Sequence, residues 1–147
     1  MSTSGDPETG DAPAGFVPLE NATEGERFNG PYFIRRSAGV AALGFRVKPR
    51  HLNAAGLCHG GLLAVFADML GYAIGVGTSS GAAPTVTLSL DFLAPVRDGD
   101  WVEATPEITR DTRRLTFFRA LMQVDGNAVV RCNGIYKKRT SGPRPGD

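Results

Sequence analysis

The sequence predicts an α+β fold in which an antiparallel sheet packs around one long central helix. Two observations support this prediction. Residues 59–76 are apolar on nearly every face of a helix, which is typical of a helix buried on most sides. The chain after this helix contains four strand-like runs separated by short turn sequences. One early helix followed by a meander of strands indicates a single sheet with one main helix.

Two short extended runs precede the helix, at residues 32–34 and 40–47, and a loop with Pro49 and Asn53 follows them. After the helix, residues 78–84 form a loop of Ser, Gly and Ala. The four later strands are predicted at residues 85–93, 101–109, 115–124 and 128–138. Turn residues separate them at 97–100, 110–112 and 125–127, and polar and apolar residues alternate within 85–90 and 101–104.

The composition limits the classes of protein to which the chain can belong. Of its 147 residues, 41% are hydrophobic and 21% are charged, as in globular domains. The 16 basic and 15 acidic side chains nearly cancel, which argues against a nucleic-acid-binding protein. Two cysteines are too few for a disulfide scaffold or a four-cysteine zinc module. The sequence shows neither a signal peptide nor an apolar run long enough for a membrane span, so we expect a cytoplasmic protein that does not enter membranes.

We expect one domain over residues 29–139 with a tail at each end. Residues 1–28 are rich in Gly, Pro, Ser, Thr and acidic residues, with Arg27 as the single base. This composition predicts a flexible N-terminal tail, although Phe16 and its apolar neighbours could dock on the domain. Residues 140–147 carry Gly and Pro and predict a C-terminal tail.

Asp68 lies in the middle of the apolar helix, where we expect it to be buried. A buried carboxylate is costly unless something compensates for its lost hydration, so a functional acid is one interpretation. A structural Asp that hydrogen-bonds a neighbouring strand, or an Asp at a wet dimer contact, is the alternative.

His59, Gly60 and Gly61 open the same helix. The first amides of a helix have no acceptor within it and carry the positive end of its dipole, so they can stabilise an oxyanion. A helix junction that needs glycine for steric reasons alone is the alternative. Gly60 and Asp68 are eight positions apart, roughly 12 Å along a helix. If both act on one substrate atom, they therefore come from two subunits related by a two-fold axis.

The pattern Asn53-x5-His59-Gly60-Gly61-x6-Asp68 resembles the signature of the hotdog-fold acyl-CoA thioesterases, in particular the phenylacetic-acid-degradation (PaaI-like) branch. The resemblance covers roughly residues 32–139. It implies the hotdog fold, hydrolysis of an acyl-CoA thioester, and a homodimer or homotetramer. No cofactor is implied, because coenzyme A is part of the substrate, and the sequence shows no cluster of metal ligands.

The resemblance also implies roles for individual residues. Asp68 matches the general base that activates water, or a nucleophile, and Gly60 matches the glycine whose amide polarises the thioester carbonyl. Asn53 matches a residue that helps to hold the water or the substrate. His59 matches an orienting histidine. Thr85 falls where relatives carry a Ser or Thr near the attacking water.

Further residues are expected to bind the substrate. Gly61 is expected to let the substrate approach the helix backbone closely, because it has no side chain. Tyr72 falls where a related branch has a helper hydroxyl, and a core or pocket-lining tyrosine is the alternative. Arg113 and Arg114 lie at a predicted strand turn and could contact the coenzyme A phosphates, because Arg makes bidentate phosphate contacts. A solvated hairpin end is the alternative for both arginines.

Other functions of the same fold stay open. A hotdog hydratase or dehydratase usually pairs a catalytic His with an acid at a different spacing. A non-catalytic acyl-CoA-binding protein would gain little from Asp68. Cys58 beside His59 invites a Cys–His nucleophile, but a small buried hydrophobe is the default interpretation. The acyl group could be aryl or medium-chain aliphatic.

Overall fold

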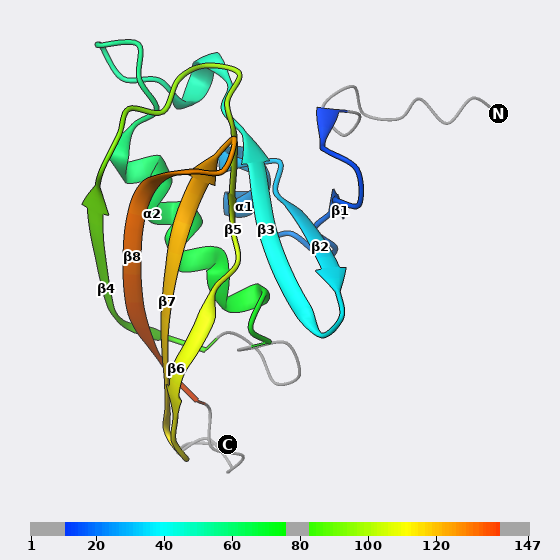
Figure 1. Cartoon of the computed structure of the whole chain (residues 1–147), viewed down its shortest axis with the longest axis vertical. Helices are drawn as coiled ribbons and strands as arrows, with labels where there is room; N and C mark the ends of the chain where they lie inside the picture. Colours follow the sequence, from blue (N-terminus) through cyan, green and yellow to red (C-terminus); the bar gives the residue numbers. More distant parts are fainter. Residues whose placement is uncertain (1–10, 76–82, 139–147) are drawn as a thin grey trace, which may run out of the picture.

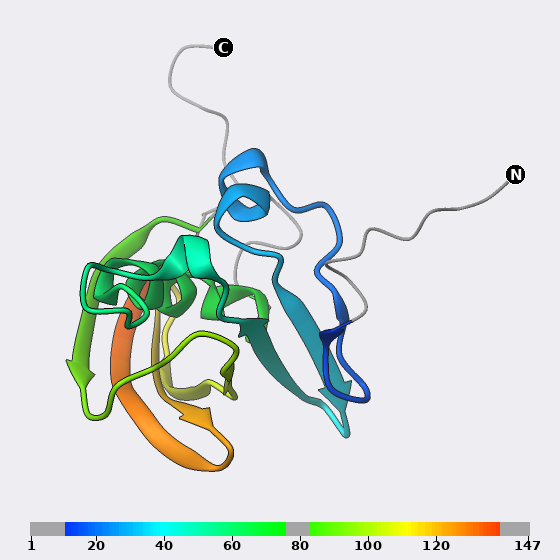
Figure 2. The same cartoon turned by 90° about the horizontal axis from the view of Figure 1, so that it is seen from above.

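The computed structural model describes residues 11–75 and 83–138. In this part of the chain, eight strands form one antiparallel sheet that curls around helix α2 (Gly60–Met69), as Figures 1 and 2 show. The strand order is β1-β2-β3-β5-β7-β8-β4, and β6 pairs with β7 off this path. The predicted α+β class, an antiparallel sheet around one central helix, is confirmed. None of the helices within these residues is long and apolar enough to cross a membrane.

Most strands lie close to their predicted positions, whereas β1 lies in the segment that was predicted to be a tail. Their bounds are β1 (Val17–Pro18), β2 (Phe33–Ser37), β3 (Val40–Arg46), β4 (Thr85–Phe92), β5 (Trp101–Ala104), β6 (Glu107–Asp111), β7 (Leu115–Val124) and β8 (Asn127–Lys137). The single strand predicted over residues 101–109 is wrong, because Thr105 and Pro106 divide it into β5 and β6. Proline has no amide to donate to a strand ladder, so the pairing with β7 is interrupted between β5 and β6.

The central helix is shorter than the prediction of residues 59–76. It ends at Met69 and continues as a tighter 3-10 turn, η3 (Leu70–Tyr72). At this point the hydroxyl of Tyr136 accepts a hydrogen bond from the Gly71 amide and donates one to the Asp68 carbonyl. Both backbone groups would have helical partners in a continuous α-helix, so the tyrosine ends the helix. Residue 76 and most of the predicted 78–84 loop lie outside the described residues.

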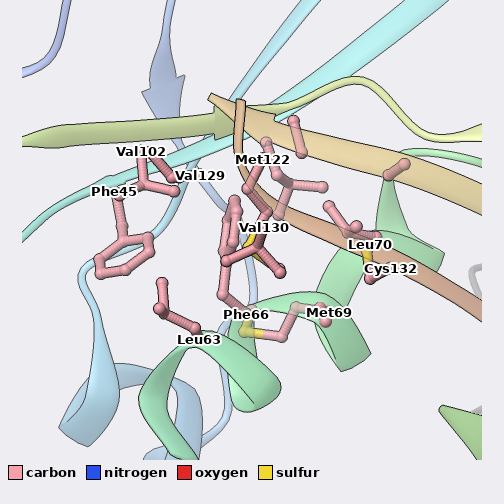
Figure 3. Close-up of a cluster of buried hydrophobic side chains, with 14 of the residues drawn as sticks. Phe45, Leu63, Phe66, Met69, Leu70, Val102, Met122, Val129, Val130 and Cys132 are labelled. Carbon is pink, nitrogen blue, oxygen red and sulfur yellow. The ribbon is translucent and has the colours of Figure 1, made fainter. Parts of the chain in front are cut away.

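The hydrophobic core lies between α2 and the concave face of the sheet. Figure 3 shows Phe66 and Met69 of α2 among Phe45, Met122 and Val130 of the strands. The ring centroids of Phe66 and Phe45 are 4.9 Å apart. Burying an apolar side chain of this size contributes about 1.5–3 kcal/mol. The core therefore fixes the helix against the sheet and determines which face of the helix the sheet leaves exposed.

The structure differs from the predicted flexible tail over residues 1–28. From residue 11 onward the chain lies on the domain: Phe16 is buried and its ring packs edge-on against Trp101, with centroids 5.0 Å apart. Helix α1 (Glu24–Asn29) follows, and Thr23 and Glu26 form a capping box at its start. Aromatic burial and capping thus hold a segment whose composition alone suggests disorder. Residues 1–10 and 139–147 lie outside the described residues.

Candidate active site

Asp68 lies in the last turn of α2, and its side chain is exposed in the single chain. The expectation of a buried acid is therefore wrong for one chain. Apolar neighbours such as Phe66 and Ala67 are turned toward the sheet, whereas Asp68 and Gly61 are exposed on the helix face that the sheet does not cover. The hydroxyl of Thr85 donates a hydrogen bond of 2.5 Å to Asp68 Oδ1. The structure thus brings together two of the residues that the sequence predicted for catalysis.

A strand irregularity directs Thr85 toward the helix. Thr85 is the first residue of β4, and the register of β4 against β8 shifts between Thr85 and Thr87. Leu88 and Leu90 of the same strand pack against the core. An extra residue in a strand reverses the side on which the following side chains point, and such bulges commonly re-aim a side chain. The shift therefore lets Thr85 face α2 although it lies three positions before Leu88.

Gly60 and Gly61 begin α2, and His59 is its N-cap with an extended backbone. The amides of the two glycines have no acceptor inside the helix, because they belong to its first turn. A Cβ atom on Gly60 would lie 3.1 Å from Cζ of Phe92, so the aromatic ring already lies against this glycine. The start of α2 is therefore next to the end of β4.

The loop before α2 holds Asn53 and His59 in defined positions. The 3-10 turn η2 (Pro49–His51) leads into this loop, and Leu52 and Cys58 form an isolated bridge across it. Asn53 Oδ1 accepts hydrogen bonds from the amides of Ala55 and Leu57, at 2.9 and 3.2 Å. The side chain of His59 is exposed.

Asn53 and His59 are thus placed by the loop and not by contact with Asp68 or Thr85. Within the described part of one chain, neither side chain hydrogen-bonds Asp68. The buried thiol of Cys58 is a poor nucleophile, because burial raises its pKa to about 11.

Tyr72 makes a contact that the sequence did not predict. Its hydroxyl donates a hydrogen bond of 2.6 Å to Glu26 Oε1, and this bond, with partial burial, raises the pKa of Tyr72 to about 12. The partner lies in α1, which the composition had assigned to a tail. In one chain the hydroxyl thus ties the N-terminal helix to the turn after α2.

Arg113 and Arg114 are exposed in the turn between β6 and β7. The Lys138 amide donates to the Arg114 carbonyl at 2.8 Å, and Tyr136, two residues before Lys138, is paired with Thr85. The arginine turn therefore lies at the same end of the sheet as Thr85.

Helix α2 and strand β4 run in opposite directions, side by side. Gly60 at the start of α2 contacts Phe92 at the end of β4, and Asp68 near the end of α2 bonds Thr85 at the start of β4. Among the described residues β4 pairs with β8 alone, so its other edge has no strand partner. Val86 and Phe92 expose 57% and 58% of their surface on this strand. One chain thus offers the two halves of the predicted site at opposite ends of an open edge.

One residue of this region was missed in the sequence. Tyr136 hydrogen-bonds the backbone on both sides of Met69, but in the sequence it looks like an ordinary core residue of β8. Its place in the strand alternation predicts that it faces the helix, and the position of its hydroxyl cannot be read from that pattern. Among the described residues, His, Cys, Asp and Glu form no group of three that could hold a metal ion.

Comparisons with known proteins identify the family. The model of the thioesterase superfamily matches residues 55–130. The Pseudomonas aeruginosa protein named "Putative esterase PA0474" is 35% identical over 130 residues, which are 84% of this chain and 95% of that protein.

Solved structures show the same fold. The TT0310 protein from Thermus thermophilus has a TM-score of 0.70 at 24% identity, covering 80% of this chain and 99% of its own. A mutant of the phenylacetic acid degradation protein PaaI from the same organism has a TM-score of 0.69 at 23% identity, covering 80% of this chain and 100% of its own. The predicted hotdog fold and the resemblance to PaaI-like proteins are thereby confirmed. The chain belongs to the thioesterase superfamily, and its enzyme class is that of a thioester hydrolase.

Proposed function

We propose that this protein hydrolyses the thioester of a small aryl or medium-chain acyl-CoA. The observation that carries the proposal is the Asp68–Thr85 pair, exposed on the open face of α2 and held by a 2.5 Å hydrogen bond. An exposed carboxylate held by a neighbouring hydroxyl can activate water, and a thioester has a good leaving group. The proposed reaction requires no cofactor or metal. We also propose that the enzyme works in the cytoplasm.

The proposed site is completed by a second copy of the chain. Two β4 strands that pair along their open edges about a two-fold axis run antiparallel, so the Thr85 end of one strand meets the Phe92 end of the other. Asp68 is tied to Thr85, and Gly60 lies against Phe92. Asp68 therefore comes near Gly60 of the partner subunit, which removes the separation of roughly 12 Å within one helix. Two such dimers would form the proposed homotetramer.

The chemistry follows from these positions. The Gly60 amide donates to the thioester carbonyl oxygen and stabilises the negative charge that develops on it. Asp68 takes a proton from water as the water oxygen bonds to the carbonyl carbon. The tetrahedral intermediate then collapses, the carbon–sulfur bond breaks, and the coenzyme A thiolate leaves. In the alternative route, the Asp68 carboxylate attacks the carbonyl itself and water hydrolyses the resulting anhydride. Thr85 holds Oδ1 and so orients the other oxygen in both routes.

The remaining predicted residues are assigned to binding and orientation. The Gly61 amide lies next to that of Gly60 and can share the oxyanion. The side-chain oxygen of Asn53 accepts hydrogen bonds from its own loop. Its side-chain nitrogen is therefore the atom that we assign to holding water or substrate. His59 acts as an orienting residue at the helix start. Tyr72 is assigned to substrate binding, and in one chain its hydroxyl donates to Glu26.

Arg113 and Arg114 are assigned to binding the phosphates of coenzyme A. Arg113 and Arg114 are exposed at the end of the sheet where Thr85 lies. Coenzyme A carries a phosphoadenosine and a pyrophosphate, which guanidinium groups bind in bidentate fashion. An acyl-CoA bound with its thioester near Asp68 can therefore reach this turn with its phosphates.

The proposal is tested by following thiol release from a panel that includes phenylacetyl-CoA, hexanoyl-CoA and crotonyl-CoA. We expect the wild type to hydrolyse at least one of them and Asp68→Ala, still folded, to lose about 10²-fold or more in kcat. Asp68→Asn keeps the size of the side chain and should be as inactive as Asp68→Ala. Equal thiol release by wild type and both variants would remove Asp68 from the mechanism. Binding of acyl-CoA without turnover, or hydration of crotonyl-CoA, would replace the proposed function.

A further inference from the structure

A buried tyrosine occupies the place where α2 ends. The Tyr136 hydroxyl donates to the carbonyl oxygen of Asp68 at 2.8 Å and accepts from the amide of Gly71 at 2.9 Å. In a continuous α-helix these two groups would bond to backbone partners four residues away. Tyr136 therefore takes the place of two helical hydrogen bonds on either side of Met69, and the chain continues as the 3-10 turn η3.

The ring of Tyr136 is held on two sides. It is 3% exposed and stacks on Phe118 of β7, with ring centroids 5.1 Å apart and planes 12° from parallel. On the other side lies Gly71, where a Cβ atom would approach the tyrosine Cζ to 3.0 Å and its hydroxyl oxygen to 3.2 Å. The packing thus fixes the hydroxyl at the helix end.

Tyr136 and Thr85 act on the same residue from neighbouring strands. They lie directly opposite each other in the β4–β8 ladder. Thr85 donates to the carboxylate of Asp68, and Tyr136 donates to its backbone carbonyl. Burial, with the nearby Asp68 charge, raises the pKa of Tyr136 above its ordinary value, so the hydroxyl keeps the proton that it donates. The two strands therefore hold Asp68 at both its side chain and its backbone.

We propose that Tyr136 is a positioning residue for thioester hydrolysis: it fixes the backbone of Asp68 and so the direction in which the carboxylate points. The inference rests on the proposed function, because Tyr136 acts through Asp68. Its buried hydroxyl is bonded to the backbone and does not touch the substrate. Without it, the last turn of α2 can relax toward a regular helix and the carboxylate turns away from its reacting geometry. Such a loss falls on kcat and leaves KM nearly unchanged.

The test compares Tyr136→Phe with Tyr32→Phe. Tyr32 is a matched control, because it is 4% exposed and its ring stacks on Phe66 of the same helix. We expect Tyr136→Phe to lower kcat about 10- to 100-fold with KM within twofold of wild type. We expect no further loss when Tyr136→Phe is added to Asp68→Ala, because the tyrosine has then nothing to position. Tyr32→Phe should keep kcat within twofold.

A second variant keeps the test decisive if Tyr136→Phe does not fold. Gly71→Ala retains the hydroxyl but pushes it from the helix end, and we expect the same loss in kcat at unchanged KM. A folded Tyr136→Phe enzyme with kcat within twofold of wild type overturns the inference, as does an equal loss in both tyrosine variants. Inactivity of Asp68→Ala beside full activity of Tyr136→Phe refutes the positioning role alone. A wild type that hydrolyses no acyl-CoA refutes the proposed function instead.

Discussion

Replacing Gly60 by proline removes the backbone N–H that the proposed mechanism uses. Gly60 is the first residue of α2, where its amide has no helical acceptor and proline is well tolerated. The preceding His59 has φ −59° and ψ 132°, an extended backbone that is compatible with a following proline. Removal of one oxyanion donor costs about 10²–10³-fold in kcat. Because Gly61 can take part of the charge, we expect the lower end, about 10²-fold or ~2.7 kcal/mol.

Gly60→Ala is the matched control for the proline variant. It adds the same Cβ atom, 3.1 Å from the exposed ring of Phe92, but keeps the N–H. The ring can shift by a few tenths of an ångström, so we expect kcat within about threefold of wild type and an unchanged melting temperature. Both variants are assayed by thiol release from the best acyl-CoA, after thermal unfolding has shown that they fold. If alanine is as damaging as proline, the glycine is needed for space. If proline is as active as alanine, the amide is not the oxyanion donor.

Three further results are expected. Thr85→Val should lower kcat about tenfold, because it releases the Asp68 carboxylate from the 2.5 Å hydrogen bond. The control Thr87→Val, on the same exposed strand, should change kcat less than twofold. Equal effects of the two variants would contradict the role of this hydrogen bond. Gly134→Ala should destabilise the fold by about 1–3 kcal/mol in urea unfolding, because its Cβ would lie 2.6 Å from a ring carbon of Phe118, and an unchanged midpoint would refute this packing argument. Cys58 and Cys132 are buried, and burial raises the pKa of each thiol to about 11. A thiol reagent at pH 8 should therefore modify them far more slowly in native than in unfolded protein. Rapid labelling of the native protein would contradict their burial.

The elements that were predicted correctly depend on local patterns. The β7–β8 turn was predicted from Asp125 and Gly126, and both adopt the positive φ angles, 50° and 79°, that a two-residue hairpin needs. Alternation over residues 85–90 predicted β4, and the run of apolar residues predicted α2. Such patterns are sufficient because a strand or helix must turn its apolar side chains toward one core.

The features that were not predicted depend on partners far away in the chain. The end of α2 is set by Tyr136, which lies 65 positions from Gly71 and shows no local signal for that contact. The N-terminal segment is ordered through Phe16, whose partner Trp101 lies in β5. The exposure of Asp68 has a similar origin, because apolar neighbours along a helix do not show which face the sheet leaves open. Each of these features is decided by tertiary packing and not by local composition.

A mixed dimer distinguishes a site shared between subunits from a site within one chain. Asp68→Ala and Gly60→Pro are each expected to be inactive as homodimers. If Asp68 works with Gly60 of the partner subunit, a dimer of the two variants has one site with both defects and one site with neither. Mixed dimers isolated through two different affinity tags should then show about half of the wild-type activity, because one of two equivalent sites is intact. If both residues acted within one chain, each chain of the mixed dimer would carry one defect and no activity would return. Activity no greater than that of the two homodimers would therefore refute the shared site, whereas recovery would show that Asp68 works with Gly60 of the partner subunit.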